Sequence, residues 1–412
     1  MREPGFNTKA IHGNISKTDV HSAIRFPVYS GVAYEFESSE DIEGAFKGTK
    51  PAHIYSRSSN PTVEAFEKKL TALENGYGTV ALSSGMAAIT NTLLNLLESG
   101  DNILASNYLF GNTYSLFKHT LPTFGLETRF IDIARPETIE QVIDSRTRLI
   151  FFETISNPQM VVPDISSLVN IAKANNLTSI IDSTVTSPYL FQACDYGADL
   201  VIHSTTKYIS GGATSVGGAI VDLGNGRWGN YACLQKYHHL KENAFLARLR
   251  REVYRNFGSC MSPQAAHFQS LGLETLSLRV DKSCANTLSV AEFLDQRQDV
   301  TAVYYPGLKS SPFYEIAQKQ FNGSFGGILA FELKDRETSF KFINSLKLIR
   351  CATNLNDNHS LIIHPASTIY ADFTPEQRSE MGVSEQLIRL SVGIEDVEDL
   401  LYDIEQALAR VS

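Results

Sequence analysis

The sequence predicts an α/β fold with a mostly parallel central sheet, followed by a smaller α+β domain. Between Thr79 and Asp222, short apolar runs alternate with longer amphipathic segments, which is the pattern of strands joined by crossover helices. After Gly258 the pattern changes to long helical segments followed by short strands. The chain has 412 residues, 43% of them hydrophobic and 20% charged, which is enough to bury a sizeable core.

Three segments are expected in chain order. Residues 1–55 show weak periodicity and many aromatic side chains, so we expect an N-terminal arm that contacts a neighbouring subunit. Residues 56–258 are expected to form the large domain and residues 259–412 the smaller C-terminal domain. The predicted strands are 80–82, 103–105, 149–152, 179–181, 200–202, 218–221 and 327–331, and a long helical pattern covers 263–278.

Polar side chains follow three of these predicted strands closely. They are Glu153, Asp182 and the segment Ser204–Lys207. Because the carboxyl ends of parallel strands meet at one edge of a sheet, functional groups gather there. The sequence therefore predicts a site at this edge, since core packing does not explain three polar strand ends.

Lys207 is the most informative residue of that site. A lysine that is partly desolvated keeps some neutral amine, which can form an imine with an aldehyde. Taken alone, a solvated turn lysine would be the better interpretation. However, Asp182 ends a neighbouring predicted strand, and a carboxylate there is the partner that a protonated pyridine nitrogen needs. Together, the two residues suggest pyridoxal phosphate.

A candidate phosphate site lies at Ser84-Gly85-Met86. An apolar run precedes it, and alanines and leucines that favour a helix follow it. The N-terminus of a helix offers backbone N–H groups and a favourable dipole to an anion. Many α/β turns of this kind bind nothing, so this motif supports the cofactor hypothesis without establishing it.

Composition argues against several classes of partner. The formal net charge is -9 and no block of consecutive basic residues occurs, so neither a nucleic acid nor an anionic membrane is an expected partner. No segment has the ~18 apolar residues of a membrane span and no signal peptide begins the chain, so a cytoplasmic location is expected. The five cysteines lack C-x-x-C spacing, and we expect no disulfide framework and no metal site.

The motifs, taken in order, resemble those of the Cys/Met-metabolism group of fold-type-I pyridoxal-phosphate enzymes over nearly the whole chain. This group includes O-acetylhomoserine sulfhydrylase, cystathionine γ-synthase, cystathionine γ-lyase and methionine γ-lyase. The resemblance implies an aspartate-aminotransferase-like fold. The matching motifs are Tyr55-Ser56-Arg57 with Asn60-Pro61-Thr62, Ser84-Gly85-Met86-Ala87-Ala88, Asn157-Pro158, Asp182, Ser204 to Lys207 with Gly211-Gly212, His364-Pro365-Ala366-Ser367, and Arg389-Leu390-Ser391-Val392-Gly393.

The resemblance implies a role for each of these residues in binding the cofactor. Lys207 would bind the cofactor's aldehyde and move protons between substrate carbons, while Asp182 would keep the pyridine nitrogen protonated. Tyr55 and Arg57 would reach the phosphate in a neighbouring subunit, so the active unit would be at least a dimer. The expected assembly is a homotetramer built from such active dimers. The residues implied for the phosphate within one chain are Ser84, Gly85, Met86, Ser204 and Thr206.

The resemblance also implies how the substrate is held. Arg389 would bind the substrate α-carboxylate with the paired hydrogen bonds that a guanidinium favours, helped by Asn157 and Ser360. The alternative for Arg389 is a surface ion pair, which its apolar neighbours Ile388 and Leu390 disfavour.

Within the group, the C-terminal third looks more like O-acetylhomoserine sulfhydrylases than like the cystathionine enzymes, at residues 272–279 and 360–368. This implies γ-replacement on O-acetyl-L-homoserine, or a close O-acyl-homoserine, by a sulfur nucleophile, giving homocysteine and acetate in methionine biosynthesis. The nearest alternatives are a γ-lyase, a cystathionine γ-synthase-like enzyme, or a specialised enzyme that forms C–C or C–N bonds from the vinylglycine intermediate. Outside catalysis, the alternative is a regulatory protein that binds pyridoxal phosphate without turnover.

One departure from the group concerns the expected catalytic set, Lys207, Asp182 and Phe110. Relatives usually carry tyrosine where this chain has Phe110, and that tyrosine stacks on the pyridine ring and has been given an acid-base role. Phe110 keeps the stacking but cannot transfer a proton. Either Tyr108 or Tyr114 substitutes, or Lys207 and water suffice for a good leaving group, or the substrate differs. The segments 182–185 and 369–370 also depart from the usual sequence.

Overall fold

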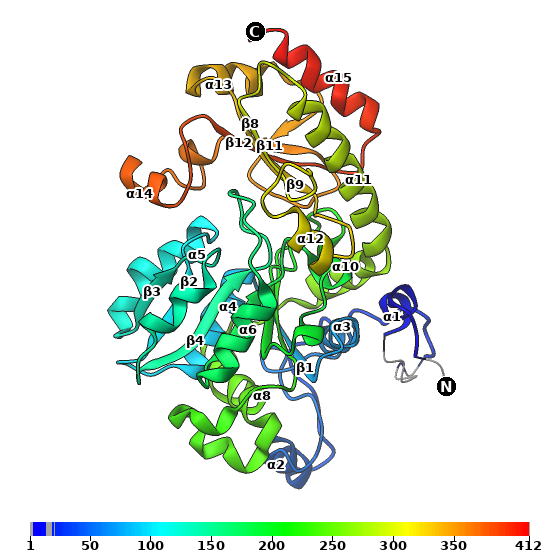
Figure 1. Cartoon of the computed structure of the whole chain (residues 1–412). Helices are drawn as coiled ribbons and strands as arrows, with labels where there is room; N and C mark the ends of the chain where they lie inside the picture. The colour runs from blue at the N-terminus through cyan, green and yellow to red at the C-terminus, as the bar shows by residue number, and fades with distance from the viewer. Residues whose placement is uncertain (1–2, 14–18, 20, 412) are drawn as a thin grey trace.

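The larger of two sheets forms the centre of the molecule. The computed structural model describes residues 3–13, 19 and 21–411, and Figure 1 shows the arrangement of its elements. In spatial order the seven strands are β1 (Gly78–Leu82), β7 (Gly218–Asp222), β6 (Leu200–His203), β5 (Thr178–Asp182), β4 (Thr147–Glu153), β2 (Asn102–Ser106) and β3 (Glu127–Ile131). Only β7 runs antiparallel to its neighbours, so the prediction of a mostly parallel sheet is confirmed.

Helices connect and cover this sheet. Helix α4 packs on β1, β6 and β7, and α6 packs on β4 and β5. The helices of the first 258 residues are α1 (Phe6–His12), α2 (Ser39–Lys47), α3 (Pro61–Leu73), α4 (Gly85–Leu96), α5 (Gly111–Ser115), α6 (Ile165–Ala174), α7 (Ser187–Leu190), α8 (Ala244–Arg248) and α9 (Arg255–Phe257).

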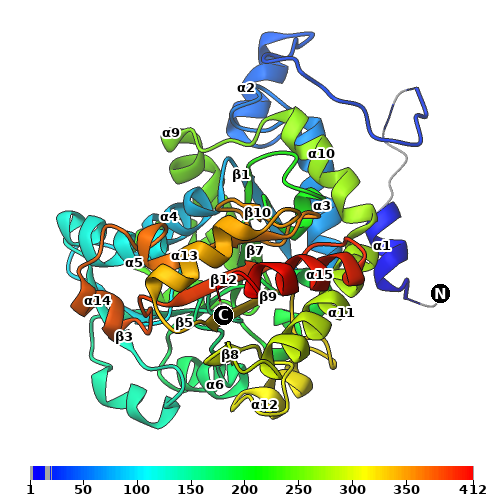
Figure 2. The same cartoon turned by 90° about the horizontal axis from the view of Figure 1, so that it is seen from above.

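A second, five-stranded sheet lies above the first in the view of Figure 1. Its spatial order is β10 (Arg350–Cys351), β11 (Leu361–Ile363), β12 (Leu387–Ser391), β9 (Ile328–Glu332) and β8 (Ala302–Tyr304). Seen from above in Figure 2, α13 and α15 cross this sheet. The helices of this part are α10 (Pro263–Glu274), α11 (Leu276–Asp295), α12 (Tyr314–Gln320), α13 (Arg336–Ser345), α14 (Pro375–Glu380) and α15 (Val397–Leu408).

Two elements differ from the sequence prediction. Strand β3 was not predicted, because its residues Glu127–Ile131 are mostly half-exposed at the sheet edge and lack a continuous apolar run. The helical pattern over 263–278 is two helices, which meet at Thr275. This residue has φ -112° and ψ 11°, outside the helical region, so the chain changes direction there.

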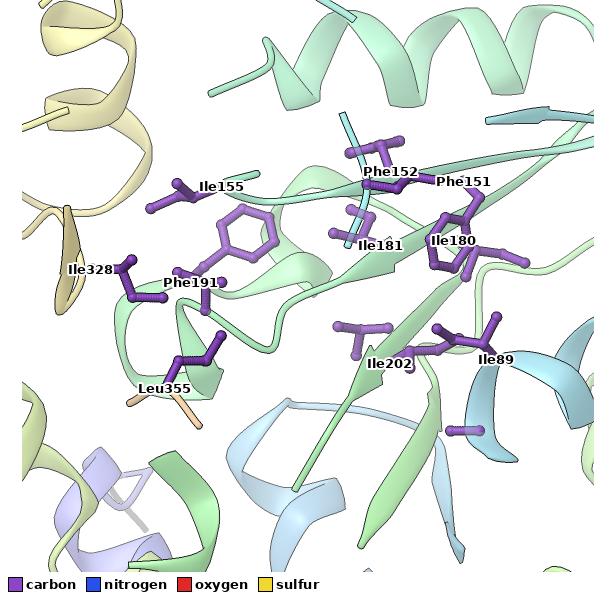
Figure 3. Close-up of a cluster of buried hydrophobic side chains, with 14 of the residues drawn as sticks. Ile89, Phe151, Phe152, Ile155, Ile180, Ile181, Phe191, Ile202, Ile328 and Leu355 are labelled. Carbon is purple, nitrogen blue, oxygen red and sulfur yellow. The ribbon is translucent and has the colours of Figure 1, made fainter. Parts of the chain in front are cut away.

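The hydrophobic core extends from the large sheet into the contact with the second one. Figure 3 shows Phe151, Ile180, Ile202 and Ile89 packed between the central strands and α4. In the same view, Ile155, which follows β4, and Phe191, which follows α7, lie beside Ile328 and Leu355 of the C-terminal part. Both halves therefore support the loops at the carboxyl ends of β4, β5 and β6.

The N-terminal segment has few buried residues. Ile24, Val32 and Phe46 are exposed on this single chain, and among the residues described in this segment the bridge between Ala33 and Tyr55 is the only strand-like pairing. This arrangement fits the expected arm, whose contact with another subunit stays a prediction. In the part of the chain that the structure describes, no helix is both long and apolar enough to cross a membrane.

Candidate functional site

Lys207 lies in the turn that follows β6, between the two sheets. Its Nζ donates a hydrogen bond of 2.6 Å to Oδ1 of Asn354, which comes from the loop after β10. Burial and, to a smaller extent, the nearby Arg389 cation lower the pKa of Lys207 to about 8, and the Asp357 carboxylate partly opposes them. A usable fraction of neutral amine is therefore present near neutral pH.

Asn354 links Lys207 to two charged groups. Its Nδ2 donates to Oδ2 of Asp357 at 3.0 Å, and its backbone carbonyl accepts from Nη2 of Arg389 at 2.8 Å. The Asp357 contact turns the amide so that its oxygen faces the lysine. Sequence reasoning missed Asn354 and Asp357; the available signal was the dense polar run Asn354–His359 directly before the apolar strand β11.

Arg389 lies at the centre of β12, paired with Ala330 and Ile363 on either side. It is fully buried, and its Nε has no hydrogen-bond partner among the described residues. Burial lowers the pKa of this guanidinium to about 10, so it remains a cation at neutral pH. The surface ion pair considered as an alternative is wrong, because the side chain is not at the surface. A buried cation with an unused donor is suited to bind a carboxylate.

Asp182 and Glu153 lie side by side at the ends of β5 and β4, where they are register partners. Burial raises the pKa of Asp182, while the Thr184 hydroxyl and N–H, the latter at 3.0 Å, oppose that rise. Burial, followed by repulsion from Asp182, raises the pKa of Glu153 well above its ordinary value. Two such carboxyl groups cannot both ionise easily, so a cation near Asp182 would favour its ionised form.

The predicted phosphate loop and the lysine turn meet in space. Ser84 caps α4 by accepting from the Ala87 N–H at 3.0 Å, which leaves the first N–H groups of the helix available. A Cβ added to Gly85 would lie 2.7 Å from Cβ of Ser204, so only glycine permits this approach. Thr206 lies in the same turn, and its hydroxyl accepts from the Gly217 N–H at 3.0 Å.

Asn157 and Ser360 were both expected beside the substrate. Asn157 is buried, and its side-chain oxygen has no partner among the described residues, so it keeps an unused polar atom. Ser360 needs a correction: its N–H and hydroxyl both donate to Glu395, at 2.6 and 2.8 Å, and thus no donor is left for a carboxylate. Among the described residues, Asn354 takes the place beside Arg389 that the sequence analysis gave to Ser360.

Phe110, Tyr55 and Arg57 complete the predicted set. Phe110 lies at the start of α5, and its N–H donates to Oε1 of Glu153 at 2.7 Å, which places it beside the two carboxyl groups.

Tyr55 and Arg57 are exposed. The Arg57 guanidinium stacks 5.5 Å from the Tyr55 ring, and its Nη1 donates to the Arg255 carbonyl at 2.6 Å. Their predicted role in a neighbouring subunit is one that a single chain does not test.

The residues present fit pyridoxal phosphate. An amine with a lowered pKa is available for the aldehyde, a carboxyl group for the pyridine nitrogen, and a helix N-terminus held open by Gly85 for the phosphate. The buried Asn157 oxygen and Arg389 Nε are unpaired polar atoms that a bound amino acid and cofactor can satisfy.

Comparisons with known proteins agree with this site. Residues 7–409 match the model of the family described as "Cys/Met metabolism PLP-dependent enzyme". The chain is 39% identical to an L-methionine γ-lyase of Pseudomonas putida, over 98% of this chain and 97% of the relative. It is 38% identical to O-acetyl-L-homoserine sulfhydrylase 1 of Thermus thermophilus, over 98% of this chain and all of the relative.

Solved structures give the same result. A crystal structure of a putative O-acetylhomoserine (thiol)-lyase from Campylobacter jejuni, which contains N'-pyridoxyl-lysine-5'-monophosphate, superposes with a TM-score of 0.94. That protein is 37% identical to this one, over 98% of this chain and 99% of the solved chain. The fold and site define a fold-type-I, pyridoxal-phosphate-dependent enzyme. The chain belongs to the Cys/Met metabolism family of these enzymes.

Proposed function

We propose that this enzyme replaces the γ-substituent of O-acetyl-L-homoserine, or of a close O-acyl-homoserine, with a sulfur nucleophile. The observation that carries the proposal is the shared residue Asn354, which holds both the Lys207 amine and the buried Arg389 guanidinium. A carboxylate-binding cation so close to a proton-accepting amine is suited to an α-amino acid. Relatives named O-acetyl-L-homoserine sulfhydrylase, at 36% and 38% identity, supply the substrate class.

Arg389 binds and orients the substrate in this proposal. Its unpaired Nε donates to the substrate α-carboxylate, while its Nη2 stays fixed to the Asn354 carbonyl. Since Lys207 reaches the same asparagine, the α-carbon of a substrate bound in this way lies close to the lysine. The buried Asn157 provides a further polar contact within the site.

Lys207 moves the protons. Its neutral amine takes the proton from the substrate α-carbon and later a proton from the β-carbon, and it returns protons to these carbons as the product forms. Pyridoxal phosphate, when bound, supplies the conjugated ring that takes up the electrons released at these carbons, and Asp182 keeps its nitrogen protonated. Hydrogen sulfide and O-acetylhomoserine enter, and homocysteine and acetic acid leave.

Phe110 favours an acyl group as the leaving group. A carboxylate such as acetate has a conjugate acid with a pKa of roughly 4, whereas a thiolate has one of roughly 8.5 or higher. The first departs without receiving a proton, but the second needs an acid close to the sulfur. Phe110 has no hydroxyl to supply that proton. This residue thus favours O-acyl-homoserine over methionine.

The second candidate is a γ-lyase, which the 39% identity to a methionine γ-lyase favours. The two functions are separated by incubating the purified holoenzyme with O-acetyl-L-homoserine, with and without sulfide, and identifying products by mass. Homocysteine that appears only with sulfide supports γ-replacement. Ketobutyrate formed with or without sulfide would show a lyase, and L-methionine as the better substrate would contradict the argument from Phe110.

The cofactor roles and the assembly belong to the same proposal. Tyr55 and Arg57 are proposed to reach the phosphate of a neighbouring subunit, because they are exposed on their own chain. A homotetramer in the cytoplasm is the proposed form. The proposed contacts to the phosphate in one chain are the N–H groups of Gly85 and Met86 and the hydroxyls of Ser84, Ser204 and Thr206. The Thr206 hydroxyl would exchange its 3.2 Å hydrogen bond to the Gly217 carbonyl for one to the phosphate.

Removing the Asp357 charge is expected to lower the pKa of Lys207 below its value of about 8. Asp357 stabilises the ammonium form, so Asp357→Asn destabilises the cation and the neutral amine persists to lower pH. The measurement is reductive ¹³C-methylation of the cofactor-free protein, followed by an NMR titration of the Lys207 resonance. A pKa that stays the same or rises would contradict the described arrangement of Lys207, Asn354 and Asp357.

Adding a methyl group at Gly85 is expected to weaken cofactor binding. In Gly85→Ala the new Cβ would lie 2.7 Å from Ser204 Cβ, and overpacking of this kind costs about 1–3 kcal/mol. The cofactor dissociation constant should therefore rise between about 5- and 150-fold, as measured by fluorescence titration of the cofactor-free protein. Gly229→Ala is the matched control, because a Cβ at Gly229 meets nothing within 4 Å.

A further inference from the structure

Two buried side chains hold the turn that carries Phe110, and neither belongs to the catalytic set described above. The turn Leu109–Gly111 leads from β2 into α5. Glu153 reaches it from the end of β4, and Tyr370 reaches it from the loop that follows β11 in the C-terminal part. The two contacts thus come from different sheets of the molecule.

Glu153 binds the turn through backbone N–H groups. Its Oε1 accepts from the Phe110 N–H at 2.7 Å, and the Asn157 N–H also hydrogen-bonds to its carboxyl group. The side chain is 6% exposed, so water does not compete for these contacts. One carboxyl group therefore fixes the backbone at Phe110 and at Asn157 together.

Tyr370 binds the same two segments through carbonyl groups. Its hydroxyl lies 2.8 Å from the Leu109 carbonyl oxygen and 3.3 Å from the Asn157 carbonyl oxygen, and the side chain is fully buried. Beside it, the Ile369 carbonyl oxygen approaches Gly111 so closely that a Cβ there would collide with it. The C-terminal part thus packs directly on the turn.

We propose that Glu153 and Tyr370 are positioning residues that hold the Phe110 turn and Asn157 from two sides. Glu153 accepts the N–H groups of both segments, and Tyr370 occupies their carbonyl oxygens. The inference rests on the proposed function, in which Asn157 lies beside the substrate, and on the stacking of Phe110 on the cofactor ring that the family resemblance implies. Because Tyr370 belongs to the C-terminal part, it also couples the placement of that part to the placement of the ring-stacking residue.

The test uses hydrogen–deuterium exchange of the cofactor-free protein, read on a peptide that covers residues 108–116. In Glu153→Ala the exchange of the Phe110 amide should rise at least about tenfold, because a buried N–H loses its acceptor. In Tyr370→Phe the same peptide should exchange faster, although only an oxygen atom is removed. Glu153→Gln should recover at least half of the lost protection, since the amide oxygen still accepts hydrogen bonds.

Tyr231→Phe is the matched control. Tyr231 is also buried, and its hydroxyl also bonds two partners: the Arg148 carbonyl at 2.9 Å and the Thr178 hydroxyl at 2.6 Å, at the opposite end of β4. This variant should leave the 108–116 peptide unaffected. Equal exchange in the Tyr231 and Tyr370 variants, or a Phe110 amide that stays protected in Glu153→Ala, would overturn the proposal.

Kinetics of the holoenzyme give a second, separate reading. Loss of either contact misplaces groups that act during the reaction, so kcat should fall about tenfold while KM changes less than threefold. Exchange is measured without cofactor or substrate, and therefore it tests the positioning role even if O-acetylhomoserine proves to be the wrong substrate. If the 108–116 peptide exchanges faster in the Glu153 and Tyr370 variants but their kcat is unchanged, the two residues hold the turn without affecting catalysis, and the proposed positioning role in the reaction is overturned. If Glu153→Ala does not fold, Glu153→Gln and Tyr370→Phe still decide the question.

Discussion

Lys207→Ala is expected to reduce turnover by at least about 10³-fold, within the range that loss of a proton-transferring group causes. The lysine is the amine whose lowered pKa of about 8 and contact with Asn354 place it to move protons in the site. Steady-state rates with O-acetyl-L-homoserine and sulfide give the size of the loss. Small alkylamines added to the variant should recover part of the rate, since they can enter the space left by the side chain.

The control for this variant is Lys69→Ala. Burial also lowers the pKa of Lys69, but this lysine lies on α3 and pairs with Glu274 at 3.5 Å, outside the site. We expect it to keep normal turnover. A Lys207→Ala enzyme with full activity, or one that no amine rescues although the protein is folded, would contradict the role given to the lysine.

Arg389→Ala is expected to lower kcat/KM by about 30- to 4,000-fold, because truncating one partner of a buried, hydrogen-bonded charge pair costs about 2–5 kcal/mol. Arg389 is fully buried, and its unpaired Nε is the donor proposed for the substrate carboxylate. Arg389→Lys keeps the positive charge but loses the paired hydrogen bonds of a guanidinium. Its kcat/KM should therefore lie between those of the unchanged enzyme and Arg389→Ala.

A substrate analogue separates loss of binding from loss of folding. The decarboxylated amine related to O-acetylhomoserine has no carboxylate, so its binding should differ little between the normal enzyme and Arg389→Lys. Melting temperature and cofactor affinity of each variant report on folding. If the arginine variants bound O-acetylhomoserine and the decarboxylated amine with equally reduced affinity, Arg389 would not be the group that recognises the carboxylate.

The chemically distinctive residues could be predicted from the sequence, because they follow apolar runs that end at one sheet edge. Lys207 and Asp182 were found in this way, and the family match over residues 7–409 confirms the class of enzyme. Strand β3 was missed, since an edge strand with half-exposed residues lacks the continuous apolar signal. The break at Thr275 was missed because the apolar pattern continues through it.

The polar residues around the lysine were harder to predict. Asn354 and Asp357 follow no predicted strand. Asn354 reaches Lys207, and Asp357 holds Asn354, only because the C-terminal part lies against the turn that follows β6. Ser360 was assigned to the carboxylate by its place in a motif, but folding commits its donors to Glu395. Such contacts depend on which side chain faces which loop, and a motif does not contain that information.

The sequence by itself determined the fold class and the cofactor chemistry and pointed to Lys207 and Asp182, because strand patterns and reactive residue types are local properties of the chain. The role of Arg389 was predicted from the resemblance of its motif to a known family. Only the tertiary structure decided that Asn354 holds the lysine and that Glu153 and Tyr370 hold the Phe110 turn. These contacts join residues 43 to 261 positions apart. Their partners are selected by how the loops of the C-terminal part and the ends of neighbouring strands come together in the fold, which no local pattern specifies.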